Sequence, residues 1–282
     1  MVRIIYLIVP LVFILVVFFT YRENNKLEIS QIEVEDKNIP ESFSGFRIVH
    51  LSDLHNKFFG RRQECLIEKI RSLNPDLIVF TGDLVDKNYY NENAGLELLA
   101  RAKKIAPTYF AVGNNDLWSG HWEELKGKIN ALDVDILTEE SRELVRRGES
   151  VVLVGVNDLL SSPGGEEYPE EVVSEKLDQA LAGVKEDTYK ILIIHRPQYL
   201  DTFNHFGLNL VLAGHTHGGQ IRLPFIGGLI APEQLLFPKY SAGLYKKGST
   251  TLIINRGLGN SFLPQRLFNR PEVGLIILQR KN

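Results

Sequence analysis

The sequence predicts an α/β fold with substantial parallel pairing between strands, and two observations support this. Short runs rich in β-branched residues recur along the 282-residue chain, and amphipathic stretches with helical spacing separate several of them. Alternation of this kind is typical of sheets covered by helices. The predicted strands are residues 46–51, 77–81, 108–112, 151–156, 191–195, 210–213, 251–255 and 275–278, and the predicted helices are residues 62–73, 94–104, 122–132 and 170–182.

The composition is that of a globular protein with a sizeable core. The chain has a formal net charge of -3, and 44% of its residues are hydrophobic. No run of basic residues marks a nucleic-acid-binding face, so we expect no nucleic acid partner. Cys65 is the single cysteine, which excludes an intrachain disulfide, and we expect it to be a small core residue of a helix.

An apolar segment begins the sequence. Residues 4–19 carry no charged side chain, and Arg3 and Arg22 flank the segment. We predict a transmembrane signal anchor over residues 1–21 rather than a cleaved signal peptide, because the run exceeds a usual signal-peptide core and no small-residue cleavage site follows. Residues 22–44 are then a tether and the first edge strand, and residues 45–282 form the main domain. We expect a single-pass protein of the cell membrane with this domain on the extracytoplasmic side, because the segment before the anchor is very short.

Polar side chains follow five of the predicted strands at the point where each strand ends. They are Asp53 and His55; Asp83 and Asp86; Asn114, Asn115 and Asp116; His195; and His215 and His217. Because sites in open α/β sheets are built at the carboxyl ends of the strands, we expect these side chains to lie together. A lone Asp before a turn is commonly a helix cap and a lone His is usually structural, but five such motifs in order indicate a site.

The residue types indicate metal binding. Carboxylate, amide and imidazole groups without any thiolate suit Mn²⁺, Fe²⁺, Zn²⁺ or Co²⁺. Seven such ligands are too many for one ion with an open position, whereas two ions that share a carboxylate account for them. Two ions a few ångströms apart are the arrangement used for in-line displacement at phosphorus. The sequence therefore predicts two divalent metal ions and a phosphate-containing substrate.

The order of these motifs resembles that of the calcineurin-like metallophosphoesterase superfamily. The matching motifs are Asp-x-His, Gly-Asp-x-x-Asp, Gly-Asn-x-Asp, a single His and Gly-His-x-His, and the resemblance covers roughly residues 45–280. The sequences around His195, at 214–228 and at 255–260 are similar to the YkuE/YaeI-type subgroup, whose members are often membrane-associated. The resemblance implies a four-layer α-β-β-α sandwich of two mixed sheets, with both metals at one edge of the strands.

The resemblance also implies roles for individual residues. The first metal would be held by Asp53, His55, Asp83 and His217, and the second by Asp83, Asn114, His195 and His215. Asp86 and Asp116 would support these ligands without binding a metal. Asp83, Asn115 and His195 would take part in catalysis, and Arg196 and Arg222 are candidates for phosphate binding, although either could equally be a solvated surface arginine.

One position departs from the family pattern. The third motif usually has His where this chain has Asn115, and an amide cannot deliver a proton at neutral pH. We therefore expect substrates with good leaving groups, such as phosphoanhydrides or aryl esters, unless His50, His121 or His205 supplies the proton. The anchor and the apolar loop 223–237 favour a lipid-linked or cell-envelope substrate, although that loop could instead pack over its own core. A nuclease or cyclic-nucleotide phosphodiesterase and a non-catalytic metal-binding scaffold are the alternatives.

Overall fold

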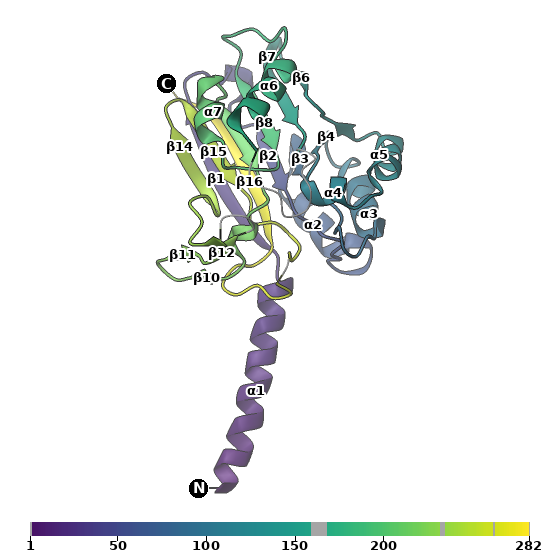
Figure 1. The fold of residues 1–282 in the computed structure, drawn as a ribbon, viewed down its shortest axis with the longest axis vertical. Helices are drawn as coiled ribbons and strands as arrows, with labels where there is room; N and C mark the ends of the chain where they lie inside the picture. The colour runs from purple at the N-terminus through teal and green to yellow at the C-terminus, as the bar shows by residue number, and fades with distance from the viewer. Residues whose placement is uncertain (1, 159–167, 232–234, 262, 282) are drawn as a thin grey trace.

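Two six-stranded mixed sheets form the centre of the protein (Figure 1). The computed structural model describes residues 2–158, 168–231, 235–261 and 263–281. The first sheet has, in spatial order, β1 (Glu28–Asp36), β16 (Glu272–Arg280), β2 (Arg47–Leu51), β3 (Leu77–Thr81), β4 (Thr108–Ala111) and β5 (Asp135–Ile136). The second has β14 (Gly243–Lys247), β15 (Thr250–Ile254), β9 (Leu210–Ala213), β8 (Lys190–Ile194), β7 (Glu149–Val156) and β6 (Glu140–Arg146).

Helices cover the outer face of each sheet. They are α2 (Glu64–Ser72), α3 (Asn93–Ala102), α4 (Asn114–Trp118), α5 (Trp122–Ala131), α6 (Glu170–Ala180) and α7 (Leu200–His205), and short 3-10 turns form η1 (Glu41–Phe43), η2 (Arg61–Gln63) and η3 (His217–Gly219). One buried cluster joins the first sheet to α2, α3 and α5, and another joins the second sheet to α6 and α7. A third cluster lies between the two sheets. The layers are therefore helix, sheet, sheet and helix.

The predicted α/β class and parallel pairing are confirmed. Each of the eight predicted strands lies on a strand of the structure, and β2, β3, β4 and β5 pair in parallel, as do β7, β8, β9 and β15. The predicted helices lie at α2, α3, α5 and α6. The prediction for Cys65 was wrong, because this residue lies on the exposed side of α2 while the neighbouring Leu66 and Ile67 enter the core.

The sequence did not predict two short antiparallel hairpins in the apolar loop. They consist of β10 (Arg222–Leu223) with β11 (Gly227–Gly228), and β12 (Ile230–Ala231) with β13 (Leu235–Leu236). Residues 232–234 of this loop lie outside the described residues. Strands of two residues have no periodicity that a sequence pattern could reveal.

The apolar N-terminal segment forms α1 (Val2–Asn25), which projects away from the body of the protein (Figure 1). Its apolar side chains between Val9 and Phe18 are exposed around the helix. Among the described residues, no helix is both long enough and apolar enough to cross a bilayer, so the predicted transmembrane span is not confirmed. Only Lys26 and Leu27 separate α1 from β1, so little chain remains for a tether.

The strand register places the base of α1 beside the carboxyl ends of the parallel strands. At its start, β1 pairs Glu28 with Glu272 of β16, and β16 runs antiparallel to β2 with Gly274 opposite His50. The first residue of β1 is therefore level with the residues that directly follow β2. Figure 1 shows β10, β11 and β12 at this same end of the body.

Candidate metal centre

The seven predicted metal ligands are all buried and come together at one edge of the two sheets. They lie directly after β2, β3, β4, β8 and β9, as the sequence predicts. Two groups of side chains present their ligand atoms within 4.8 Å of one another: Asp53, His55, Asp83 and His217 in one, and Asp83, His195 and His215 in the other. Asp83 belongs to both groups, which is the arrangement that two ions with a bridging carboxylate require.

The first group is centred on two imidazole nitrogens. Nε2 of His55 lies 3.1 Å from Nε2 of His217 and 3.5 Å from Oδ2 of Asp83. Nε2 of His217 lies 3.4 Å from Oδ1 of Asp53. Four ligand atoms therefore converge from three different loops.

The second group has similar geometry. Nε2 of His195 lies 3.3 Å from Oδ2 of Asp83 and 3.1 Å from Nδ1 of His215. Oδ1 of Asn114 lies 3.1 Å from the same nitrogen of His195, which adds the amide oxygen to the group. Oδ2 of Asp83 therefore faces the histidines of both groups.

The electrostatics of these residues favour a positive charge between them. Burial raises the pKa of the Asp53 carboxyl, and the neighbouring Asp83 adds to this effect. Burial alone would lower the pKa of His195, but the carboxylates of Asp83 and Asp53 outweigh it and raise that pKa to about 10. Two buried carboxylates so close together need a cation, and divalent ions would meet this need with ligands of the right type.

Neighbouring groups orient two of the histidines. Nδ1 of His195 lies 2.7 Å from the carbonyl oxygen of Thr81, to which it can donate, so Nε2 keeps its lone pair toward the site. Oδ2 of Asp86 lies 3.6 Å from Nδ1 of His55, on the side of the ring away from Asp83. A carboxylate in this position holds the ring with Nε2 facing the metal position.

The ligand loops have unusual backbone geometry. The φ angles of Asp53, His55, Asp83, His215 and His217 are 52°, 45°, 59°, 70° and 49°, in the left-handed region that residues other than glycine seldom adopt. Such strain persists only where the surroundings hold it in place. Gly113 and Gly214 pack so tightly against this backbone that a Cβ on either would collide with Asp83 or Ser52, which accounts for the glycines of the motifs.

Asp116 holds the loop that carries Asp83. Its fully buried carboxylate accepts hydrogen bonds from the backbone N–H groups of Asp83, Leu84, Val85 and Gly113, at 2.8 to 3.2 Å. Burial and the nearby Asp83 raise the pKa of Asp116 to about 7. Its hydrogen bonds therefore go to the backbone of the ligand loops.

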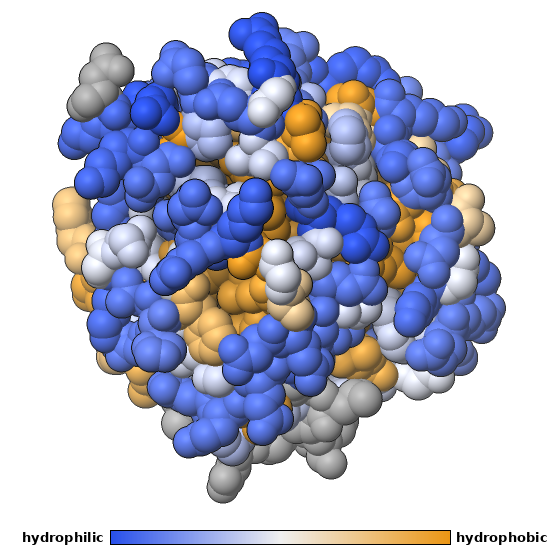
Figure 2. Space-filling model, turned by 90° about the horizontal axis from the view of Figure 1, so that it is seen from above, coloured by the Kyte–Doolittle hydropathy of each residue, from blue (hydrophilic) through white to orange (hydrophobic). Residues whose placement is uncertain are grey.

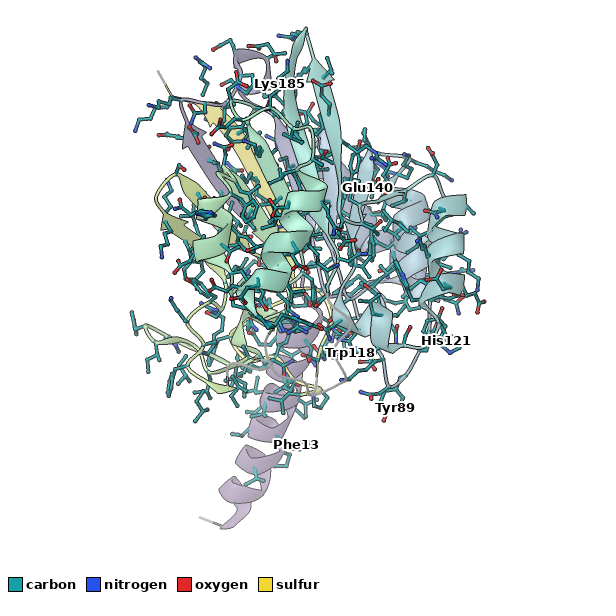
Figure 3. All side chains as sticks on the ribbon, turned by 45° about the horizontal axis from the view of Figure 1, so that its top comes forward. Phe13, Tyr89, Trp118, His121, Glu140 and Lys185 are labelled. Carbon is teal, nitrogen blue, oxygen red and sulfur yellow. The ribbon has the colours of Figure 1, made fainter. Side chains whose placement is uncertain are left out.

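Asn115 points its amide at the shared carboxylate. Its Nδ2 donates to Oδ2 of Asp83 at 2.7 Å, and its backbone N–H donates to Oδ1 at 2.7 Å. Its Oδ1 accepts from the backbone N–H of Lys87, whose Nζ lies 4.4 Å from the ring centre of Trp118. Figure 3 shows Trp118 and Tyr89 at the end of the body from which α1 leaves.

The histidines outside the site are placed elsewhere. His50 is fully buried with Nε2 2.9 Å from Oγ1 of Thr81, and burial lowers its pKa to about 3, so the ring is uncharged at neutral pH and cannot act as a general acid. His121 stacks on Tyr90 at a centroid distance of 4.2 Å on the surface. His205 is exposed at the end of α7.

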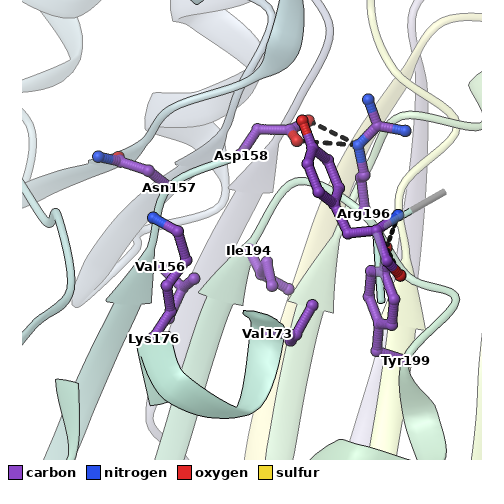
Figure 4. Close-up of a pocket in the computed structure, with 9 residues that line it drawn as sticks. Val156, Asn157, Asp158, Val173, Lys176, Ile194, Arg196 and Tyr199 are labelled. Atoms are coloured by element: carbon purple, nitrogen blue, oxygen red, sulfur yellow. Dashed lines mark hydrogen bonds and ion pairs between the residues drawn. The ribbon is translucent and has the colours of Figure 1, made fainter. Parts of the chain in front are cut away.

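The two arginines proposed for phosphate binding differ in their surroundings. Arg196 is buried, and its Nε donates to both carboxylate oxygens of Asp158 at 2.9 Å (Figure 4). Its Nη1 lies 3.4 Å from Nε2 of His215. The adjoining cavity has a volume of about 10 Å³, enough for about one water molecule and too small for a substrate. Arg222 is half-buried and donates to the carbonyl oxygen of Gly218.

Sequence reasoning missed Asp158 and Arg266. Arg266 is 1% exposed, and its Nη2 lies 3.4 Å from Nδ1 of His217. No motif surrounds either residue, and buried arginines are rare enough that composition argues against them. Only the folded chain brings them to the site.

Comparisons with known proteins show the family to which the chain belongs. The family model of the calcineurin-like phosphoesterases matches residues 46–219. The uncharacterized metallophosphoesterase YkuE of Bacillus subtilis (strain 168) is 31% identical over 93% of this chain and 89% of its own length. A transmembrane protein with metallophosphoesterase domain from Danio rerio is 28% identical over 90% of this chain, which spans 57% of that relative.

A solved structure shares the fold. The crystal structure of TT1561 from Thermus thermophilus matches 76% of this chain and 91% of its own, with a TM-score of 0.52 and 15% sequence identity. The family match covers every predicted metal ligand. The chain therefore belongs to the calcineurin-like phosphoesterase family, in a subgroup that resembles YkuE.

Proposed function

We propose that this protein is a dinuclear-metal phosphoesterase that hydrolyses a phosphate ester or anhydride at a membrane surface. The observation that carries the proposal is the pair of buried ligand groups that share Asp83. Two divalent ions held there would supply a water nucleophile of lowered pKa and would neutralise negative charge on the phosphoryl group. Manganese, iron, zinc and cobalt all suit these ligands.

The residues of the chain position this chemistry. Asp86 and the carbonyl of Thr81 fix the rings of His55 and His195, and Asp116 fixes the backbone that carries Asp83. Asn115 is the side chain at the position where the family usually has a proton donor. Besides the N–H that it donates to Asp83, its Nδ2 carries a second N–H, which would donate a hydrogen bond to a phosphoryl oxygen and would keep the phosphate oriented.

The leaving group must then depart without a proton from residue 115. A phosphate leaving group has a second pKa of about 6 and needs no protonation, whereas an alkoxide does. The burial of His50 and the surface stacking of His121 also argue against these residues as substitute acids. We therefore propose phosphoanhydrides or aryl esters as substrates, in preference to alkyl diesters.

The position of α1 supports a substrate in the membrane. The strand register places the base of the helix level with the edge of the sheets that carries the metal ligands, which we call the metal edge, and the apolar side chains of the helix are exposed. Two of the relatives are named as transmembrane proteins. An enzyme held with its site next to a bilayer has a raised effective concentration of lipid-linked substrate. A lipid-linked pyrophosphate or another cell-envelope phosphate compound fits both features.

The test uses the full chain in detergent, loaded with Mn²⁺. Rates are compared for a nucleotide-diphosphate lipid, an aryl phosphodiester and an alkyl phosphodiester, with Asp83→Ala as the control. We expect hydrolysis of the first two, and loss of both activities in the control. If the chain binds metal but turns over none of these compounds, the proposed activity is wrong.

A matched variant tests the role of Asn115 separately. Asn115→His restores the usual family residue, so we expect it to raise the rate on the alkyl diester by about 10-fold or more while changing the aryl diester less. Equal effects on both diesters would show that residue 115 does not set the leaving-group preference, without affecting the case for the metal enzyme.

A further inference from the structure

Six exposed apolar side chains lie around the base of α1. They are Phe58, Phe225, Ile226, Leu236, Phe237 and Phe268, with exposed fractions between 46% and 108%. We call these six residues the apolar platform. Apolar residues grouped on a surface in this way mark contact with another molecule or with lipid.

Backbone contacts join the hairpins of the platform to the segment before Phe268, and Phe58 follows Lys57, whose Nζ donates to the carbonyl of Asn24 at the base of α1. The hairpin strand β10 lies beside the segment that precedes Phe268, since the N–H of Arg222 donates to the carbonyl of Leu267. The N–H of Leu229, at the start of the second hairpin, donates to the carbonyl of Ile221, directly before β10, so the second hairpin is attached to the first. Figure 1 shows β10, β11 and β12 together at the end of the body where α1 begins to project.

The platform is continuous with α1. The ring of Phe268 contacts that of Phe19 on the helix, with centroids 5.6 Å apart. The base of the helix is fixed to the body, because Asn24 bonds to Pro264 and Arg266 and because Glu23 pairs with Arg270 at 2.7 Å. An apolar medium around α1 would therefore meet the platform as well.

The backbone of the platform is strained. Phe225, Phe237 and Phe268 have φ angles of 68°, 56° and 50°, which bulky residues rarely adopt. Such a conformation is unfavourable and persists only where the surroundings or a function maintain it. Here the strain accompanies exposed aromatic rings, which the fold itself does not need for its core.

The chemistry of α1 indicates what covers the platform. The exposed side chains from Leu11 to Phe18 are apolar on all sides of the helix, which is typical of a helix surrounded by lipid rather than of one packed on a protein. Arg22 and Lys26 are exposed at its base, where cations would meet lipid phosphates. Charged and polar side chains dominate the opposite end of the molecule, seen in Figure 2.

We propose that the apolar platform docks into the interfacial layer of a phospholipid bilayer around α1 and holds the metal edge against that bilayer. The aromatic rings would lie among the upper acyl chains, where such side chains partition favourably. The His217 loop leads directly into β10, so docking would also fix the distance between the site and the lipid phosphates. The binding step itself does not depend on the proposed catalytic function.

The test measures whether single side chains of the platform enter the lipid. Phe225→Trp and Phe268→Trp are made separately in the full chain and reconstituted into phosphatidylcholine–phosphatidylglycerol vesicles with or without brominated acyl chains. The signal of the native Trp118 and Trp122 is subtracted with the parent chain. Val145→Trp is the matched control, because Val145 is 68% exposed and lies on β6 next to the turn into β7, at the end opposite the metal edge.

We expect bromination to quench the tryptophans of the two platform variants by at least about 2-fold and to leave that of Val145→Trp unchanged. Absence of quenching in both platform variants would overturn the proposal. Absence of quenching together with a blue shift that grows with protein density would overturn it in favour of contact between two copies of this chain. None of these readouts uses catalysis, so a failure here is separate from a failure of the proposed activity.

Discussion

The guanidinium group of Arg266 lies against the predicted metal ligand His217, with Nη2 3.4 Å from Nδ1 of the ring. The same residue contacts α1, because its backbone N–H donates to Oδ1 of Asn24 at 2.8 Å. Its Nε donates to the carbonyl of Gly259 and its Nη1 to that of Arg256, both at 2.9 Å. One buried residue thus joins the base of the helix, through its backbone N–H, to the carbonyls of Arg256 and Gly259 and to the metal centre, through its side chain.

We predict that Arg266→Lys destabilises the protein. An ammonium group cannot reproduce the fork of donors, so at least one buried carbonyl would lose its partner, at a cost of about 2–3 kcal/mol. The measurement is the urea midpoint of the full chain in detergent. Arg62→Lys is the control, because the Arg62 side chain is 71% exposed and its replacement should change stability by less than about 0.5 kcal/mol. Equal midpoints for both variants would contradict the structural role of Arg266.

Removal of the Asp83 carboxylate should weaken metal binding at both positions, whereas removal of one ligand histidine should weaken it at one position only. We predict that Asp83→Asn lowers the bound metal from two ions per chain to fewer than one, while His217→Ala removes only the first ion. Elemental analysis after dialysis against limiting metal gives the counts. Each ion should also stabilise the fold by about 2.7 kcal/mol at 100 times its dissociation constant. Loss of a single ion from Asp83→Asn would show that the carboxylate is not shared.

Much of this site could be predicted from sequence because its ligands directly follow apolar strands. Residues such as Asp83 and His195 come one or two positions after runs that are fully buried, so the strand pattern places them at one edge. The division of the ligands between two ions followed from the family resemblance, and in the structure the Asp and His side chains gather in two groups that share Asp83.

The parts that escaped prediction depend on contacts between distant segments. Asp158 and Arg196 pair across 38 positions of the chain, and Arg266 reaches His217 across 49. Neither pair has a local pattern, and a charged residue is expected on the surface unless its partner is known. The exposure of Cys65 was not predicted because the sequence pattern does not show to which face of the helix this residue belongs. It directly precedes the buried Leu66 and Ile67, and a residue in that position can face either the core or the solvent.

His50 should make stability depend on pH. Burial lowers its pKa in the folded protein from 6.5 to about 3, so only the unfolded chain binds a proton here between these values. The stability that this group contributes is therefore complete above pH 6.5 and is lost as the pH falls toward 3. We predict that His50→Gln flattens the fall in unfolding free energy over this window by up to about 1.4 kcal/mol per pH unit. Urea unfolding at several pH values, with a chelator present, measures the unfolding free energy of both proteins. Identical slopes of this free energy against pH in the parent and in His50→Gln would show that His50 does not titrate as described.

Asp116 offers the sharpest test of how the fold holds the metal ligands. Its two oxygens accept four backbone N–H bonds from the loops of Asp83 and Gly113. Asp116→Asn keeps the size but replaces one acceptor with an N–H₂ group that faces N–H donors, so we predict a loss of about 2–4 kcal/mol in stability. Asp83, with φ at 59°, would no longer be held in its strained backbone, and the bound metal should fall below two ions per chain.

The control for this variant is Asp133→Asn. Asp133 has the same φ of 59°, but its side chain is 93% exposed, and asparagine tolerates that backbone well. We expect wild-type stability and two bound ions. If Asp116→Asn behaves like this control in both unfolding and metal analysis, the N–H bonds to Asp116 do not hold the ligand loop, and the strain at Asp83 must be maintained by its metals alone.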